Sequence, residues 1–280
     1  MNIENKKQLT SAWFRELRDK ICTQFEKIED EFAAVKNLKS GKFKRKVWDR
    51  DGGGGGEISL MKGNVFEKVG VNISTVFGEF GEDFRDQIPG ANEDPRFWAN
   101  GISLVAHMAS PLVPAVHMNT RFICTTKNWF GGGSDLNPMF EIAQDTKDFH
   151  TSFKDACDKY DKSYYPKFKA QCDEYFFIKH RNESRGVGGI FYDYLNTDNF
   201  ENDFNFTKDV GLAFLNVYPK LIKKHMLESW NEKQREFQLR KRGRYTEFNL
   251  VYDRGTKFGL MTNGNPEAIL MSLPPIAKWD

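Results

Sequence analysis

The segment ISLVAHMASPLVPAVHMNTRFI, residues 102–123, contains two runs that predict extended chain, 102–106 and 115–125, joined by a corner at Ser110-Pro111. If 115–123 is a strand, successive side chains point to opposite faces. The polar face then carries His117, Asn119 and Arg121, and the apolar face carries Val116, Met118, Thr120 and Phe122. The segment therefore predicts a strand with one polar and one apolar face.

The polar face combines a proton carrier, an amide and a guanidinium in a row. An arginine can grip a carboxylate through two parallel charge-assisted hydrogen bonds, and a histidine can move a proton near neutral pH. The alternative is an ordinary solvated face of an antiparallel strand. Ser103 and His107, which the Ser110-Pro111 corner brings close, favour a binding or catalytic site.

The chain outside this segment predicts helices and further strands. Residues 11–32 repeat apolar side chains every three or four positions, which is typical of an amphipathic helix. Residues 139–160, 166–179 and 207–241 also read as helical, with a kink or break at Pro219, and 187–194 reads as a strand.

The C-terminal residues 245–279 show three short apolar runs separated by Arg254-Gly255 and by Asn263-Gly264-Asn265. Short turns of this kind join antiparallel neighbours, so we expect three C-terminal strands. The whole pattern predicts one α+β domain over 1–280, in which a large antiparallel sheet is flanked by helices on both sides. Residues 1–47 form its N-terminal helix and basic segment.

Composition excludes several classes of protein. The 280 residues carry 41 Lys+Arg against 39 Asp+Glu, a net charge of +2, so no nucleic-acid partner is expected. The four cysteines form no CxxC or CxxxCxxC motif, which argues against a cysteine-bound metal cluster. Polar residues and prolines interrupt the longest uncharged run, 97–120, so we expect no transmembrane segment. The start MNIENKKQLT has no secretory or transit pattern, and a cytoplasmic location is expected.

Two further segments offer site residues. WFGGGSDLNP, residues 129–138, reads as a glycine-rich loop that presents Asp135, either as a functional carboxylate or as the N-cap of a following helix. HRNESRG, residues 180–186, places Arg185 just before a strand, and a solvated turn is the alternative. Four of the five histidines, His107, His117, His150 and His180, fall in or near these segments, but no HExxH or His-x-His spacing indicates a metal site.

Five blocks together resemble the oxygen-dependent coproporphyrinogen III oxidases. They are GGGGGEISLMKGNVFEKVGVNIS (52–74), ISLVAHMASPLVPAVHMNTRF (102–122), WFGGGSDLNP (129–138), CDEYFFIKHRNESRGVGGIFYDYL (172–195) and EFNLVYDRGTKFGLMTNGNPEAILMSLPP (247–275). The resemblance implies oxidative decarboxylation of two propionates of coproporphyrinogen III to vinyl groups, giving protoporphyrinogen IX in haem biosynthesis. Molecular oxygen is then the co-substrate, CO₂ and H₂O₂ are products, and no organic cofactor is needed. The resemblance also implies a homodimer through 245–279.

The resemblance also assigns roles to individual residues. It makes His117 the proton donor, with Asp135 and Arg121 as further catalytic residues. The substrate-binding residues it implies are Ser103, Asn119, Thr120, Arg121, Arg185, Asn263, Gly264 and Asn265. It leaves open a divalent metal ion on His107, His117, His150 and His180.

The chain departs from the usual family pattern at Met108, Ser110, Asn137 and Asn265, the last of which stands where an arginine often follows Gly264. The chief alternative function is a non-catalytic protein that binds a tetrapyrrole or another polyanion. Such a protein would share the arginines and glycines but need not keep His117 and Asp135. The radical enzyme for the same conversion is disfavoured because its CxxxCxxC cluster is absent, and a histidine-based metal hydrolase is disfavoured because no ligand motif is present.

Overall fold

The computed structural model describes residues 1–261 and 264–279, and its central element is an antiparallel sheet of seven strands. The strand order is β1-β2-β3-β4-β5-β6-β9, so six consecutive strands form a meander and β9 adds at the far edge. The strands are β1 (Lys44–Asp49), β2 (Gly54–Met61), β3 (Phe66–Glu79), β4 (Arg96–Met108), β5 (Ala115–Cys124), β6 (Asn128–Asn137) and β9 (Gly188–Leu195), with a separate pair formed by β7 (Phe177–Ile178) and β8 (Glu183–Ser184).

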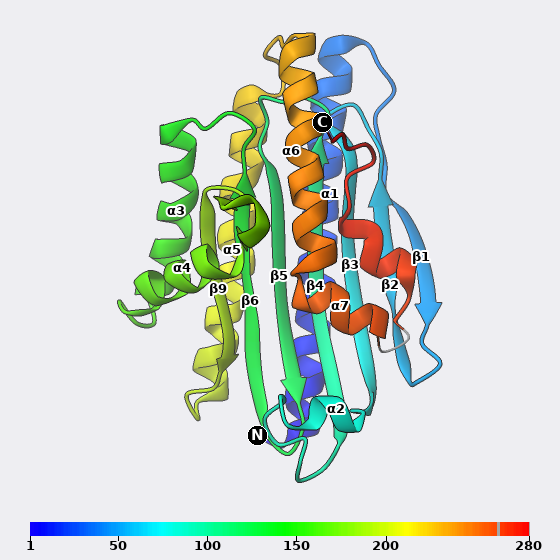
Figure 1. Cartoon of the computed structure of the whole chain (residues 1–280), viewed down its shortest axis with the longest axis vertical. Helices are drawn as coiled ribbons and strands as arrows, with labels where there is room; N and C mark the ends of the chain where they lie inside the picture. Colours follow the sequence, from blue (N-terminus) through cyan, green and yellow to red (C-terminus); the bar gives the residue numbers. More distant parts are fainter. Residues whose placement is uncertain (262–263, 280) are drawn as a thin grey trace.

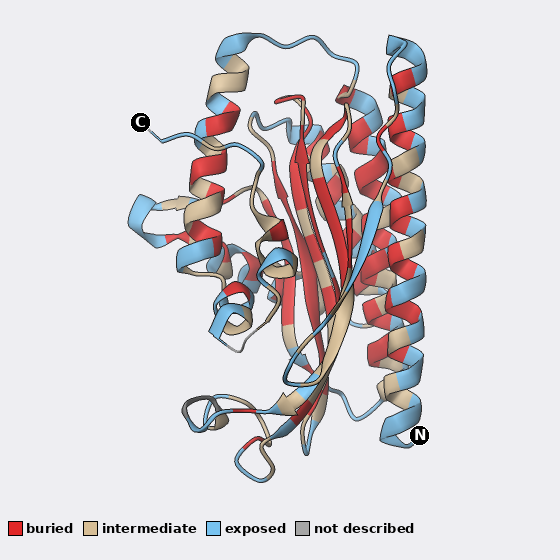
Figure 2. Ribbon diagram, turned by 90° about the vertical axis from the view of Figure 1, so that its right-hand side faces the viewer, coloured by how far each residue is buried: buried red, intermediate tan, exposed pale blue. Residues whose placement is uncertain are grey.

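Helices cover both faces of this sheet, as Figures 1 and 2 show, and the α+β prediction is confirmed. In the view of Figure 1, α1 runs behind the sheet while α6 and α7 cross in front of it. The helices are α1 (Ile3–Lys36), α2 (Glu82–Arg85), α3 (Ala143–Asp158), α4 (Tyr164–Tyr175), α5 (Phe200–His225), α6 (Glu232–Val251), α7 (Arg254–Met261) and α8 (Pro266–Ile269), with short 3₁₀ turns η1 (Lys179–Arg181) and η2 (Leu270–Ser272).

The main hydrophobic core lies between the sheet and the helices α1, α3 and α5. The helix expected over 11–32 lies inside α1, and its apolar stripe is buried because it packs on the apolar face of the strands. Phe25 stacks on Phe66 of β3 with ring centroids 4.6 Å apart. The cluster runs from α1 through the sheet to α5. This shared core favours one domain over 1–280, which stays a prediction.

Pro219 lies inside α5, which continues to His225, and the break before α6 falls at residues 226–231. The expected kink or break at Pro219 was therefore placed too early. A capping box starts α6, because the Asn231 side chain accepts from the Gln234 backbone N–H while the Gln234 side chain accepts from the Asn231 N–H.

The prediction of three C-terminal strands over 245–279 is wrong. The run around residues 247–251 ends α6, the next run forms α7, and the last forms α8 and η2. Short apolar runs do not distinguish a strand from a helix by periodicity alone, and here the sheet is already complete without them. The C-terminal segment instead covers the face of the sheet opposite α1.

A partly buried ion-pair cluster holds α6 on the face of the sheet opposite α1. Arg242 is buried and donates from Nη2 to the Glu67 carboxylate of β3 at 2.7 Å, and Arg235 donates to the same carboxylate at 2.8 and 2.9 Å. Arg242 and the buried Gln238 also donate to the Met108 carbonyl at the end of β4, both at 2.9 Å. These contacts fix α6 through polar groups.

Within residues 1–261 and 264–279, none of the helices combines the length and the apolar character that crossing a bilayer requires.

The Glu67 cluster predicts a large loss of stability for Glu67→Gln. The change removes the charge that compensates buried Arg242, so we expect the free energy of unfolding to fall by about 2 to 4 kcal/mol. Urea denaturation measures the loss. Glu79→Gln, at the exposed end of the same strand, is the matched control and should change it by less than about 0.5 kcal/mol. Equal effects of the two substitutions would show that the Glu67 ion pairs do not stabilise the fold.

Candidate functional site

The polar face of β5 points toward the α6 and α7 side of the sheet. The burial pattern alternates along the strand, so the predicted period of two is confirmed. The His117 side chain retains 15% of its exposure and that of Arg121 retains 27%. On the neighbouring strand β4, Ser103 lies opposite Asn119 and is exposed although it sits in the middle of the sheet. Part of this face is therefore open to solvent.

Asp135 lies in a strand, which corrects the expected loop and excludes the helix-cap alternative. It belongs to β6 and pairs with His117 of β5. The glycine run belongs to the same strand, with Gly131 opposite Arg121. A Cβ on Gly131 would come within 2.8 Å of Arg121 Nη2 and of Asp193 Oδ1. A larger residue at position 131 would therefore displace the ion pair between Arg121 and Asp193.

Asp135 and Arg185 form a buried, bidentate ion pair. Arg185 Nη2 donates to Asp135 Oδ1 at 2.7 Å and to Oδ2 at 2.9 Å, and both residues are at most 6% exposed. Arg185 also donates from Nη1 to Asn249 Oδ1 of α6 at 2.8 Å. Three aromatic rings surround the guanidinium at 4.1 to 4.8 Å from its Cζ; they belong to Phe176, Tyr245 and Phe248. The solvated turn is excluded for Arg185.

These contacts keep Asp135 ionised. Burial by itself raises the pKa of the Asp135 carboxyl, but the charge of Arg185 and hydrogen bonds from His117 and Arg185 outweigh it and lower the pKa to about 2. Asn137 Nδ2 donates to Asp135 Oδ2 at 2.9 Å as well. An ionised carboxylate can only accept hydrogen bonds, so the His117 nitrogen that faces Asp135 must carry a proton.

The hydrogen-bond pattern defines the tautomer of His117. Its Nδ1 lies 2.9 Å from Asp135 Oδ1 and must donate, because the carboxylate can only accept. Arg121 Nη1 donates to Asn119 Oδ1 at 3.1 Å, so the Asn119 amide turns its Nδ2 toward His117 Nε2, 2.9 Å away. His117 Nε2 therefore accepts, and the substrate-free site holds a neutral imidazole with a proton on Nδ1.

Two charged residues that the sequence analysis missed complete the row. Asp193 of β9 accepts from Arg121 Nη2 at 2.9 Å and lies 3.6 Å from Arg254 Nη2. Arg254 begins α7 and its side chain is 59% exposed. The strand predicted over residues 187–194 could have indicated that Asp193 lies in the sheet. No sequence pattern indicated that the side chain of Arg254, which was assigned to a turn, would reach β9.

The remaining predicted binding residues divide between the site and other places. Thr120 points to the opposite face of β5 and is fully buried, so it lies away from the polar face. Asn265 accepts from the backbone N–H groups of Glu267 and Ala268 and caps α8. That helix contacts the sheet beside Ser103, because Asn72, which pairs with Ser103, donates to the Ala268 carbonyl at 3.0 Å. Gly264 precedes this cap, and Asn263 lies outside the described residues.

The four candidate metal ligands lie on four different elements, and each has its own partner. His107 Nε2 donates to the Ser272 carbonyl at 2.9 Å, and His150 lies between the Val187 carbonyl and the Tyr165 hydroxyl. His180 lies between Tyr252 and Glu247. Among residues 1–261 and 264–279, no group of three His, Cys, Asp or Glu side chains is arranged to hold a metal ion. The four histidines do not fit a shared ion in this arrangement.

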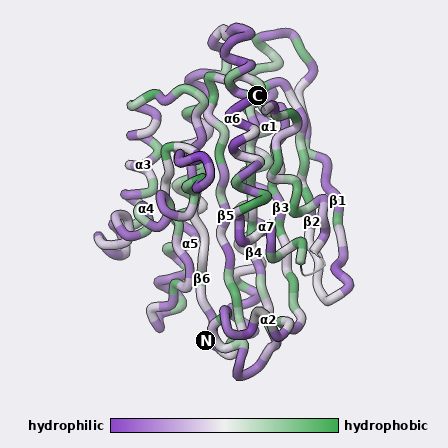
Figure 3. Tube along the Cα trace, viewed as in Figure 1, coloured by the Kyte–Doolittle hydropathy of each residue, from purple (hydrophilic) through white to green (hydrophobic). Residues whose placement is uncertain are grey.

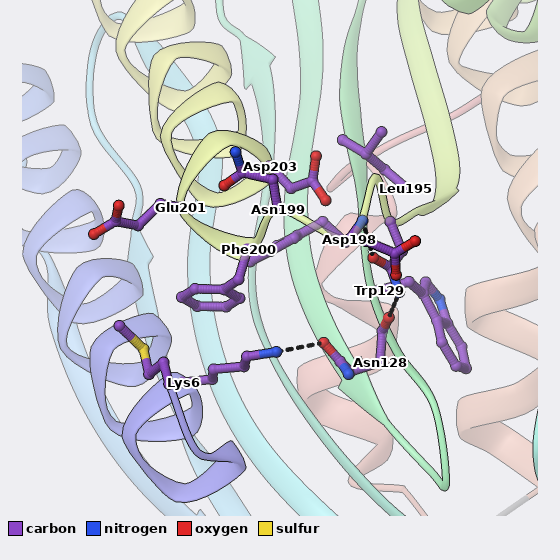
Figure 4. Close-up of a pocket in the computed structure, with 12 residues that line it drawn as sticks. Lys6, Asn128, Trp129, Leu195, Asp198, Asn199, Phe200, Glu201 and Asp203 are labelled. Carbon is purple, nitrogen blue, oxygen red and sulfur yellow. Dashed lines mark hydrogen bonds between the residues drawn. The ribbon is translucent and has the colours of Figure 1, made fainter.

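One cavity of the structure is separate from this site. It has a volume of about 580 Å³ and lies where the start of α1 meets the beginnings of β6 and α5. Figure 4 shows Lys6 reaching Asn128 across it, with Phe200 beside them. Its lining contains none of the predicted site residues. The predicted site residues His117, Arg121 and Asp135 lie instead on the polar face of β5 and β6.

Comparisons with known proteins agree over the full chain. The model of the family described as coproporphyrinogen III oxidase matches residues 9–280. The oxygen-dependent coproporphyrinogen-III oxidase of Rickettsia bellii (strain OSU 85-389) is 65% identical over 279 residues, which cover 100% of both chains. The protein of the same name from Rickettsia africae (strain ESF-5) is 64% identical over 280 residues, again covering 100% of both.

The depressed pKa of Asp135 predicts an acid-sensitive contribution to stability. A carboxyl whose folded pKa is about 2 and whose unfolded pKa is about 3.9 stabilises the fold at pH values above about 5, and this stabilisation is lost as the pH falls toward the folded pKa. Asp135→Asn should therefore flatten the acid limb of the stability profile by roughly 1 kcal/mol between pH 7 and pH 3, measured by urea denaturation over that range.

The control for this experiment is Asp86→Asn, the same substitution at an exposed position of a loop. It should leave the acid limb as in the unaltered chain. An acid limb of unchanged steepness in Asp135→Asn would show that this carboxylate is not held ionised by the fold.

Proposed function

The chain belongs to the coproporphyrinogen III oxidase family, and we propose that it converts two propionates of coproporphyrinogen III to vinyl groups, using molecular oxygen and giving protoporphyrinogen IX, CO₂ and H₂O₂. The observation that carries the proposal is the polar face of β5, where neutral His117 is held by ionised Asp135 beside a partly exposed guanidinium. The relatives named above support the same reaction.

Arginine side chains are suited to hold the substrate, which carries four propionates. Arg121 and Arg254 share Asp193 as an ion-pair partner. An incoming propionate can therefore take the place of Asp193 on Arg121, while Asp193 keeps Arg254 as its partner. Exposed Ser103 and half-buried Asn119 lie on the adjacent rung and can hydrogen-bond the same ligand. The binding surface we propose is therefore the row from Ser103 across Asn119 to Arg121 and Arg254.

The reaction consumes one proton for each vinyl group formed. The propionate loses CO₂, one proton and two electrons, while O₂ takes up two electrons and two protons to become H₂O₂. A site that holds and returns protons next to the substrate is therefore required. We assign this task to His117, whose Nε2 receives a proton from solvent or from the substrate and returns it, while its Nδ1 proton stays on the Asp135 side.

Asp135 acts on the reaction through His117. The resemblance implies that this carboxylate is a catalytic residue, but it is 1% exposed and its oxygens already accept from Arg185, His117 and Asn137. It can stabilise the positive charge that His117 gains on protonation, because the ion pair holds it close and desolvated. Asp135 and Arg185 are thus positioning residues in this proposal.

The proposal requires oxygen as co-substrate and no organic cofactor. It uses no metal ion, because the four candidate histidines serve separate hydrogen bonds in the fold. We propose a cytoplasmic location and a homodimer through 245–279. Exposed apolar side chains in that segment support the dimer; they include Leu250, Val251, Leu260, Ile276 and Trp279.

Aerobic turnover is the direct test of the function. The purified, chelator-treated chain should consume coproporphyrinogen III in air with release of CO₂ and H₂O₂, and should stop when oxygen is removed. Metal analysis of the same sample accompanies the assay. Binding of the substrate without its conversion in air would favour the polyanion-binding protein, and restoration of activity by one added metal would contradict the metal-free site.

Arg121→Met should lower kcat/KM by about 10- to 100-fold, because a charge-assisted contact to a carboxylate contributes about 1.5 to 3 kcal/mol. Arg15→Met, on the outer side of α1, removes the same charge from the opposite face of the molecule and is the matched control. Steady-state kinetics of the two variants decide. Equal values of kcat/KM for the two variants would show that Arg121 does not bind a propionate of the substrate.

A further inference from the structure

A rung of the sheet next to the proposed site contains a small gap between two polar side chains. Ala115 of β5 pairs with Asn137 of β6, and His107 lies one position beyond the Ala106–Val116 pair on the other side. His107, Ala115 and Asn137 therefore share one rung and one face. Adjacent strands are about 4.8 Å apart, so the methyl group of Ala115 leaves space between the two larger side chains.

The two side chains that flank the gap each present a buried atom without a partner. His107 is 2% exposed and Asn137 is 3% exposed, and neither His107 Nδ1 nor Asn137 Oδ1 has a hydrogen-bond partner. His107 Nε2 donates its proton to the Ser272 carbonyl, so Nδ1 carries a lone pair. Burial lowers the pKa of His107 to about 3, and the ring stays neutral. Both atoms are therefore acceptors.

The gap is closed above by α6 and is the size of one small molecule. It is a cavity of about 10 Å³ whose lining includes His107, Ala115, Asn137 and Tyr245, which is close to the lower limit for one water molecule. The buried Tyr245 hydroxyl also lacks a partner. Three cationic residues line the same cavity, namely Arg185, Lys241 and Arg242.

We propose that this cavity is a hydration site, in which one water molecule donates to His107 Nδ1 and to Asn137 Oδ1. A water has two donors for these two acceptors, and its lone pairs can accept from Tyr245. Dioxygen has no proton to donate and would leave both acceptors unpaired. An anion would leave them unpaired too, and the three surrounding cations disfavour a metal cation or ammonium.

The water connects His107 to the carboxylate of the proposed reaction. Asn137 Nδ2 donates to Asp135 Oδ2 at 2.9 Å, and a water on Oδ1 fixes the amide in the orientation that makes this contact. His107 and the water are thus positioning groups for Asp135. This role rests on the proposed function, whereas the hydration site itself does not.

A crystal structure of the full chain at about 1.5 Å resolution tests the site directly. We expect one peak in the cavity, 2.6 to 3.2 Å from both His107 Nδ1 and Asn137 Oδ1. Data collected from a crystal under xenon pressure should show no xenon there. An empty cavity, an anomalous metal peak or bound xenon would each overturn the proposal, whatever the enzymatic activity of the sample.

Ala115→Val tests the role in catalysis, because the added methyl groups fill the cavity and remove no polar atom. We expect the peak to vanish and kcat to fall by about 10-fold or more, with KM changed by less than about 3-fold. Ala115→Gly keeps the space and should keep the peak. Ala156→Val, buried in α3 behind the sheet, controls for overpacking and should leave kcat within about 2-fold.

An Ala115→Val protein that folds, lacks the water and keeps its kcat would overturn the positioning role. A protein that fails to fold leaves the crystallographic test of the unaltered chain in place. Absence of turnover in the unaltered chain would refute the proposed function. The hydration site would still be tested by the presence or absence of the water peak in the crystal structure.

Discussion

The ion pair between Asp135 and Arg185 is the contact on which the site depends. A buried ion pair is costly because both charges lose water, and it is tolerated only when the remaining hydrogen-bonding capacity is satisfied. Here the carboxylate accepts from three side chains, and the guanidinium is bonded to Asn249 and enclosed by aromatic rings. The pair joins β6, the turn before β9 and α6, so the same contact that orders the site also fastens its helical cover.

The face of the sheet opposite α1 is polar, and the helix that covers it, α6, is polar as well. Figure 3 shows mostly hydrophilic residues along α6, although the helix lies against the sheet. Its buried positions include Gln238 and Arg242, which reach polar partners on β3 and β4, and Asn249, which accepts from Arg185 in the turn before β9. A helix held in this way has no continuous apolar stripe, because its packing depends on satisfied hydrogen bonds and on a few rings. The open part of the face beside it remains available for a charged ligand.

The sequence predicts those features that depend on local periodicity. The alternation along 115–123 placed His117, Asn119 and Arg121 together, and the structure agrees, because a strand next to a core must alternate. The glycines at 131–133 suggested a loop, yet they occur in a strand, where Gly131 lies against the Arg121 side chain and Gly132 and Gly133 lie against the backbones of the neighbouring strands. The C-terminal runs suggested strands, since the stripe that identifies a helix is missing there. Asp193 and Arg254 meet only through tertiary packing, which no local pattern reports.

The histidines show how environment separates the roles of one residue type. Burial lowers the pKa of His107, which shares a rung with Asn137, to about 3. Burial also lowers the pKa of His150, whose two nitrogens join α3 to the turn before β9 and to α4. His180 fastens η1 to α6 through Tyr252 and Glu247. His117 pairs through Nδ1 with the buried Asp135 carboxylate, which Arg185 holds ionised, and its Nε2 lies on the partly open polar face of β5. The proposed function assigns proton transfer at this face to His117, while the other three hold the helices and turns that shape its surroundings.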